Sequence, residues 1–207
     1  MAHELQTLFE ASWLAVSTRR DKLKGTSVES AWPALPEPGV QSGSGGGDPA
    51  VLHHLEPARQ AARDSGFGDL IGHFDAASPY LEWTQNKHYV EEDPDHPFLS
   101  GYAFAMISGP DAPLEMRKPL CGYILIGPGV HYPAHHHAPR EIYLVLGPDV
   151  RWQLDHGEWF ATEPGDLIFH DAWQVHATKT GDAPMLAFVA WLDEGDPNGI
   201  RWAEPPE

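Results

Sequence analysis

The second half of the chain is a succession of short apolar segments, most of them ended by Gly, Pro or Asp. Segments of this length, lying between turn-forming residues, are typical of β-strands. Many short strands fit a sandwich or a closed barrel, and a closed barrel leaves no sheet edge exposed. We therefore predict an all-β second half, favour a barrel, and expect strands at residues 102–108, 121–127, 141–146, 150–154, 166–170 and 184–192.

The first hundred residues have a different pattern. Near the N-terminus apolar residues recur at intervals of three and four, which predicts a helix over about residues 2–23. Residues 25–49 contain several prolines and the run SGSGGGDP, and predict a long flexible loop. A second helix is expected from about 49 to 65, with a kink or break at Pro57. We expect both helices to pack outside the barrel, in one compact domain.

Composition limits the partners that such a chain can have. Its 207 residues are 42% hydrophobic, enough for one sizeable core, and 13 Lys and Arg stand against 30 Asp and Glu. The resulting formal net charge of −17 repels phosphate backbones and anionic lipid surfaces alike. We therefore expect neither nucleic acid nor a membrane as a partner.

Cysteine usage and the N-terminus point to the compartment and to the type of metal ligand. The single Cys121 cannot form an internal disulfide or a thiolate cluster, so any metal must be held by nitrogen and oxygen. The N-terminus lacks the basic stretch and apolar run of a secretory signal, and no segment approaches the roughly 20 apolar residues that span a bilayer. We expect a soluble cytoplasmic protein, either a monomer or a homodimer.

One segment, residues 129–147, groups the side chains that can carry chemistry. His135 and His137 stand two apart, and so do Glu141 and Tyr143. Side chains two apart on a strand point to the same face, so each pair can project into the barrel interior from neighbouring strands. Polar groups that converge in an apolar interior need a charge partner, and a metal ion supplies one.

A third imidazole is expected from His176, which lies beyond the turn at residues 164–166. Three imidazoles and one carboxylate suit Zn, Fe, Mn, Ni or Co, and the ligand types do not decide among these metals. His136 should point away from the pair that flanks it. His131 and His170 lie near the motifs, but exposed or hydrogen-bonded histidines are the commoner case, so both stay outside the ligand set.

The two histidine segments resemble the two motifs of the cupin superfamily. The second motif is matched loosely by residues 163–181, where Gly165 follows Pro164 directly. The first motif is G-x5-H-x-H-x3-E-x6-G. It is matched, with one residue fewer before the last glycine, at Gly129, His135, His137, Glu141 and Gly147.

The resemblance implies a mostly β fold with a single cupin barrel, also called a double-stranded β-helix or jelly roll. That barrel would occupy residues 100–195. Residues 1–99 would form an N-terminal helical extension that packs outside it, and residues 196–207 a C-terminal tail.

Within the cupins, the run H-Y-P-A-H-x-H-x3-E-x-Y at residues 131–143 closely resembles the dimethylsulfoniopropionate (DMSP) lyases, in which N-terminal helices precede one cupin barrel. That resemblance implies a metal-dependent lyase that cleaves DMSP to dimethyl sulfide and acrylate by β-elimination. It implies Tyr143 as the general base and Tyr132 as a substrate-positioning group. The substrate carboxylate would bind one divalent transition metal held by His135, His137, Glu141 and His176.

The substrate so implied is a small zwitterion, and aromatic faces attract its sulfonium cation by about 0.5–2 kcal/mol. Most aromatic residues of a barrel fill its core, so only one or two should contact the cation. The candidates are Trp83, Tyr89, Tyr102, Phe104, Trp173, Phe188 and Trp191.

Three other functions are compatible with a metal-binding cupin. The main alternative is a metal-dependent dioxygenase that acts on a small organic acid and uses the same ligands to hold iron. A sugar-phosphate isomerase or epimerase is less favoured, because only Arg140, Arg151 and Lys179 lie near the motifs. A non-catalytic regulatory cupin usually needs a DNA-reading module, and the acidic N-terminal helices argue against one.

Overall fold

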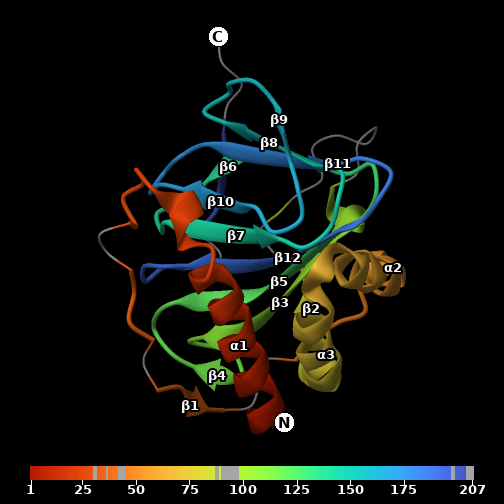
Figure 1. Ribbon diagram of the computed structural model, residues 1–207, viewed down its shortest axis with the longest axis vertical. Coiled ribbons are helices and arrows are strands. Elements are labelled where there is room, and N and C mark those ends of the chain that lie inside the picture. Colours follow the sequence, from red (N-terminus) through yellow and green to blue (C-terminus); the bar gives the residue numbers. More distant parts are fainter. Residues whose placement is uncertain are drawn as a thin grey trace.

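Two β-sheets face each other in a computed structural model that describes residues 1–29, 32–35, 37–41, 45–86, 89, 98–196 and 199–203 (Figure 1). The larger sheet contains β1 (Gly39–Val40), β2 (Trp83–Thr84), β3 (Tyr102–Gly109), β4 (Leu114–Glu115), β5 (Leu120–Ile126), β7 (Glu141–Val145), β10 (Leu167–His170) and β12 (Met185–Trp191). The smaller sheet contains β6 (His131–His136), β8 (Val150–Leu154), β9 (Phe160–Thr162), β11 (His176–Thr180) and β13 (Arg201–Trp202).

Strand pairing, antiparallel everywhere in the described residues except between β3 and β4, fixes the order of the strands. The larger sheet runs β1-β4-β3-β5-β12-β7-β10, with β2 paired to β3, and the smaller runs β13-β6-β11-β8-β9. All six segments predicted as strands form strands. The pairing makes a jelly roll, as the sequence predicts.

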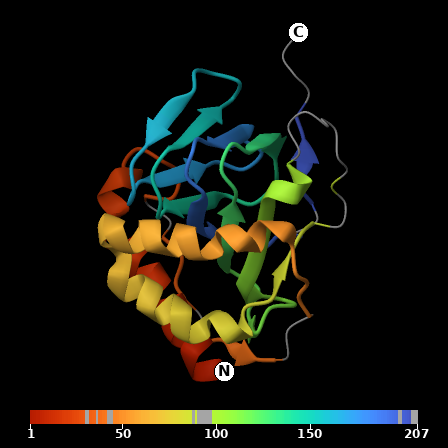
Figure 2. The same cartoon turned by 90° about the vertical axis from the view of Figure 1, so that its right-hand side faces the viewer.

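Helices cover one face of the larger sheet, as Figures 1 and 2 show from two sides. The helical elements of the described residues are α1 (Ala2–Ser17), η1 (Arg20–Leu23), η2 (Ala50–His54), α2 (Leu55–Ala62), η3 (Arg63–Phe67), α3 (Gly68–Ala77), η4 (Ser78–Tyr80) and η5 (Leu99–Gly101). Pro57 lies in the first turn of α2, where its missing N–H breaks no helical hydrogen bond, so a new helical element begins close to it. The third helix, α3, was not predicted.

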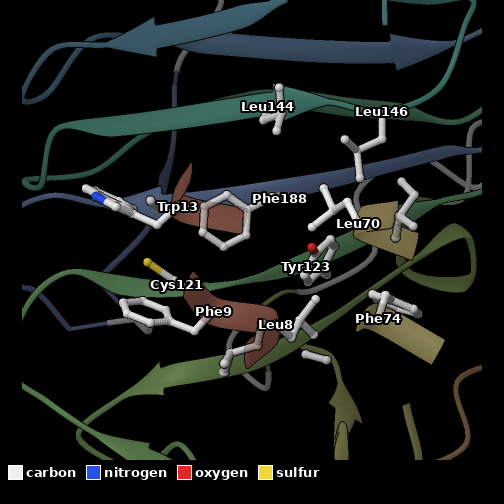
Figure 3. Close-up of a cluster of buried hydrophobic side chains, with 14 of the residues drawn as sticks. Leu8, Phe9, Trp13, Leu70, Phe74, Cys121, Tyr123, Leu144, Leu146 and Phe188 are labelled. Atoms are coloured by element: carbon white, nitrogen blue, oxygen red, sulfur yellow. The ribbon is translucent and has the colours of Figure 1, made fainter. Parts of the chain in front are cut away.

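Two separate apolar clusters hold these layers together. One fills the space between the helices and the larger sheet, and Figure 3 shows Phe9 and Trp13 of α1 there with Phe188 of β12. In the same cluster the Tyr123 hydroxyl lies 2.7 Å from Ser12 Oγ, which satisfies both buried groups. The second cluster lies inside the barrel and includes Trp152.

Strand β7 serves both clusters, because alternate residues of a strand point to opposite faces. Ile142 and Leu144 pack with the helices, whereas Tyr143 and Val145 belong to the cluster inside the barrel. All five residues of the strand are therefore buried. This two-sided burial explains why the segment reads as a nearly continuous apolar run.

One expectation about strand neighbours is wrong. The histidine pair and the Glu141–Tyr143 pair were expected on neighbouring strands, but β6 and β7 belong to different sheets. Consecutive strands of a jelly roll alternate between its two sheets, so the two pairs approach the barrel interior from opposite walls. The two pairs still point into the barrel interior, but they do so from facing sheets and not from neighbouring strands.

The expected loop and tail fall only partly within the described residues. In the segment 25–49, β1 pairs with β4, and residues 30–31, 36 and 42–44 lie outside the described part. In the expected tail, Trp202 of β13 pairs with His135 of β6, and residues 197–198 and 204–207 lie outside it. None of the helices in the described ranges combines the length and the apolar character needed to cross a bilayer.

The packing of α1 makes a testable prediction about stability. Leu8 is fully buried, whereas Leu14 on the same helix is 63% exposed. Leu8→Ala should lower the free energy of unfolding by about 2–5 kcal/mol, because it leaves a cavity against the sheet. Leu14→Ala, the matched control, should change it by less than about 0.5 kcal/mol. Urea unfolding measures both, and equal effects would show that α1 does not pack as described.

Candidate active site

The site is assembled at one end of the two sheets. Glu141, the first residue of β7, pairs with Trp191 of β12 on one side and His170 of β10 on the other. In the opposite sheet His135 of β6 pairs with His176 of β11, and His137 follows β6 directly. Strand ends from both sheets therefore bring the side chains together.

Three of the predicted ligands form a group that can hold a metal ion. The ligand atoms of His137, Glu141 and His176 all lie within 4.8 Å of one another, and all three residues are buried. Glu141 Oε2 is 3.1 Å from His137 Nε2 and 3.4 Å from His176 Nε2. Ligand atoms about 2.0–2.2 Å from a tetrahedral metal stand roughly 3.3–3.6 Å apart; the 3.4 Å spacing falls in this range, and the 3.1 Å spacing is slightly shorter.

Backbone hydrogen bonds prepare the histidines for this role. Nδ1 of His135, His137 and His176 lies 2.8, 2.9 and 2.9 Å from a backbone carbonyl oxygen two residues away. A carbonyl oxygen only accepts, so each Nδ1 carries the hydrogen and each Nε2 keeps its lone pair. His176 Nε2 has no hydrogen-bond partner among the described residues, although it is buried. A metal ion would satisfy that atom.

The electrostatics also require a positive charge at this place. Burial alone would raise the pKa of Glu141, but the adjacent histidines, His137 first, hold that pKa well below its usual value. Burial alone would lower the pKa of His137, and the charge of Glu141 raises it instead. Two acceptor atoms 3.1 Å apart need a proton or a metal ion between them. The chain's own residues therefore fit a cation.

His135, the fourth predicted ligand, is buried beside this group. Its ring centroid is 4.1 Å from that of His176, and its ring stacks on Tyr132, also at 4.1 Å. The group of three ligand atoms does not include His135. Its role as a ligand stays a prediction.

The three histidines that the sequence analysis left out of the ligand set differ in how close they lie to the site. His136 is half-buried and its ring contacts Trp173, away from the ligand group, as its position in the strand predicts. His131 contacts Trp159. His170 is different, because it is fully buried with Nδ1 2.9 Å from Glu141 Oε2. Burial and the neighbouring His176 lower its pKa to about 3, so it is neutral at neutral pH.

Sequence reasoning thus set aside a histidine that contacts the site, and it assigned Trp191 only to the substrate. The Trp191 indole donates a 2.7 Å hydrogen bond to Glu141 Oε1. A signal for His170 was present in the strand at 167–170, where Ile168 and His170 alternate with residues that face the helices. Only the register against β7 shows which ligand it meets.

An apolar cavity of about 80 Å³ opens beside Glu141. Both predicted tyrosines, Tyr132 and Tyr143, line it. Of the aromatic residues considered for the sulfonium, four line the cavity: Tyr89, Tyr102, Phe104 and Trp191. Of the other three, Trp83 and Phe188 pack on the helix side of the sheet, and Trp173 is 54% exposed.

A jelly-roll barrel that carries a buried group of His and Glu ligands defines the chain as a cupin with a candidate metal site. A family model described as dimethylsulfoniopropionate lyase matches residues 28–187. The chain is also 32% identical over 144 residues to the dimethylsulfoniopropionate lyase DddQ of Ruegeria pomeroyi, which covers 69% of each protein. The chain belongs to the dimethylsulfoniopropionate lyase family and is a carbon–sulfur lyase.

Solved structures agree with this fold. The crystal structure of the DMSP lyase DddQ from Ruegeria pomeroyi matches over 100% of both chains, with a TM-score of 0.72 and 21% identity. A chain from the crystal structures of the DMSP lyases RdDddP and RnDddQII matches over 98% of both chains, with a TM-score of 0.70 and 25% identity. The helices are therefore part of the shared architecture, together with the barrel.

The ligand group predicts how metal binding depends on single residues. A divalent transition metal at one hundred times its Kd should stabilise the wild type by about 2.7 kcal/mol. Glu141→Ala and His176→Ala should gain far less, because each loses a ligand. His136→Ala, the control, should respond as the wild type does. Thermal unfolding with and without metal, together with elemental analysis, measures these differences. Full metal retention by Glu141→Ala would place the ion elsewhere.

Proposed function

We propose that this protein cleaves DMSP to dimethyl sulfide and acrylate by β-elimination, with one divalent transition metal held by His135, His137, Glu141 and His176. The observation that carries the proposal is that Glu141, Tyr132 and Tyr143 line the same apolar cavity. A ligand carboxylate and two phenols then face one small substrate. Membership of the DMSP lyase family supports the choice of substrate.

The cavity suits a zwitterion that is charged at both ends. His137, Glu141 and His176 would hold the metal, which would supply Lewis-acid chemistry for the substrate carboxylate and for negative charge on the adjacent carbon. The sulfonium end would lie against the aromatic side chains that line the cavity, Tyr89, Tyr102, Phe104 and Trp191. Exclusion of water by these apolar walls strengthens each of the charge interactions.

In this proposal Tyr143 removes the proton from the carbon next to the carboxylate. Burial raises the pKa of Tyr143 well above its ordinary value, and the charge of Glu141 raises it further. Tyr143 therefore acts as a base only where positive charge near Glu141 offsets both effects. The proton passes to the Tyr143 oxygen, and the C–H electron pair forms the carbon–carbon double bond of acrylate. The electron pair of the C–S bond leaves with dimethyl sulfide.

Tyr132 is proposed to position the substrate. Its hydroxyl lies 2.6 Å from that of Tyr89, and its ring is stacked at 9° on His135. These two contacts hold the phenol in one orientation at the cavity wall. A group so held can orient the substrate carboxylate while Tyr143 approaches the carbon.

The activity can be measured directly. Purified, metal-analysed protein given DMSP should release dimethyl sulfide to the headspace and an equal amount of acrylate to the solution. A chelated sample should release neither until metal is restored. Consumption of oxygen with a small organic acid, without release of dimethyl sulfide, would favour the dioxygenase instead.

The two tyrosines can be separated by matched variants. Tyr143→Phe should lower kcat by about 10²–10⁴, because it removes the base, and should leave the metal content unchanged. Tyr132→Phe should mainly raise KM, because it removes an orienting hydroxyl. If Tyr132→Phe lowered kcat and Tyr143→Phe mainly raised KM, the base would be Tyr132 instead.

The proposal also covers the partners, the compartment and the oligomeric state of the enzyme. The partner is a small molecule, and we expect the protein to work in the cytoplasm, as a monomer or homodimer, without nucleic acid or membrane. The net charge of −17 supports the last two expectations, because it opposes contact with anionic surfaces.

A further inference from the structure

His170 makes two contacts with the ligand group from outside it. It is the last residue of β10, its Cα is the register partner of Glu141, and its side chain is fully buried. Its Nδ1 lies 2.9 Å from Glu141 Oε2, and its ring stacks on the ring of His176 at 3.7 Å and 11°. One side chain therefore touches a carboxylate ligand and an imidazole ligand.

The geometry separates His170 from the ligands themselves. The ligand atoms that lie within 4.8 Å of one another come from His137, Glu141 and His176, and His170 is not among them. The nitrogen that His170 directs at the site faces a carboxylate oxygen, which only accepts, so that nitrogen carries the hydrogen. A protonated ring nitrogen has no lone pair for a metal. Through Nδ1, His170 can therefore act on an ion only by way of Glu141.

The two oxygens of Glu141 have different partners. Oε1 accepts a hydrogen bond of 2.7 Å from the Trp191 indole, and Oε2 accepts one from His170. Oε2 is also the oxygen that lies 3.1 Å from His137 Nε2 and 3.4 Å from His176 Nε2. Each carboxylate oxygen has two lone pairs, so Oε2 can accept from His170 and keep a second lone pair for an ion near the His137 and His176 nitrogens.

We propose that His170 is a positioning residue that fixes Glu141 as a ligand through Oε2 and holds the His176 ring in its ligating orientation. Hydrogen bonds to ligating side chains orient them and tune their basicity. His170 lies on β10, whereas the two ligands that it contacts, Glu141 and His176, lie on β7 and β11. The inference rests on the proposed metal site and not on the identity of the substrate.

A purely structural role explains His170 less well. His170 Nε2 is buried and has no hydrogen-bond partner in the described part of the chain. An apolar side chain would fill the same space without leaving an acceptor unsatisfied, so packing alone does not favour histidine. The hydrogen bond to Glu141 is what an apolar residue cannot supply.

Two variants separate the two contacts of His170. His170→Phe keeps a ring to stack on His176 and removes the donor to Glu141. His170→Asn keeps an amide donor close to the position of Nδ1 and removes the stacking ring. The control is His136→Asn, which changes a histidine that contacts Trp173 outside the ligand group.

The readouts do not depend on turnover. Competition with a chromophoric chelator gives the Kd for Co²⁺ or Zn²⁺, and the visible spectrum of the Co²⁺ protein reports ligand geometry. His170→Phe should weaken metal binding by about 10- to 100-fold and shift the Co²⁺ spectrum. His170→Asn should restore part of the affinity, because it returns a donor to Glu141 without the ring on His176, and His136→Asn should match the wild type. If phenylalanine unfolds the barrel, His170→Leu replaces it in the same comparison.

The outcomes are distinct. A His170→Phe or His170→Leu protein that is folded and binds metal within about threefold of the wild type, with the same spectrum, would overturn the role of His170. A His170→Asn protein as weak as His170→Phe would overturn the hydrogen bond as its cause. A wild type that binds neither metal would overturn the metal site itself, and this inference with it. Metal binding without DMSP cleavage would leave the role of His170 intact and contradict the proposed substrate.

Discussion

A single buried carboxylate is the constraint on which the site depends. Glu141 lies inside an apolar barrel, where an isolated charge is strongly unfavourable. Its two oxygens are met by an indole and by imidazole nitrogens of three histidines, which come from different parts of both sheets. Because all of these partners except His137 are distant from Glu141 in sequence, the charge is fully compensated only when the whole barrel has closed. The fold and the site therefore form together.

The helical layer makes this polar interior possible. It covers the outer face of the larger sheet, so that β5, β7 and β12 can be apolar on both sides. Much of the stability then comes from the cluster around Phe188 and Tyr123, which is separate from the cavity. The barrel interior is left free to hold groups whose burial is unfavourable.

Much of this could be predicted from sequence, for reasons that are local. Strand segments, the first helix and the same-face pairs all follow from periodicity and turn residues. What periodicity cannot give is which strands meet. It placed His135 and Glu141 on neighbouring strands, whereas they face each other from opposite sheets. For the same reason it could not place His170 beside Glu141, because that contact depends on the register between β10 and β7.

The two-sided burial of β7 also limits how such a sequence can change over time. Odd and even positions of this strand serve different cores, with Tyr143 inside the barrel and Ile142 against the helices. Losing or gaining one residue within the strand would exchange the two sets, and would send a ligand into the helical layer and an isoleucine into the cavity. Substitutions can accumulate here one at a time, but a change of length would have to come in steps of two. Drift in this family should therefore lengthen and shorten its loops while the spacing from Glu141 to Val145 stays constant.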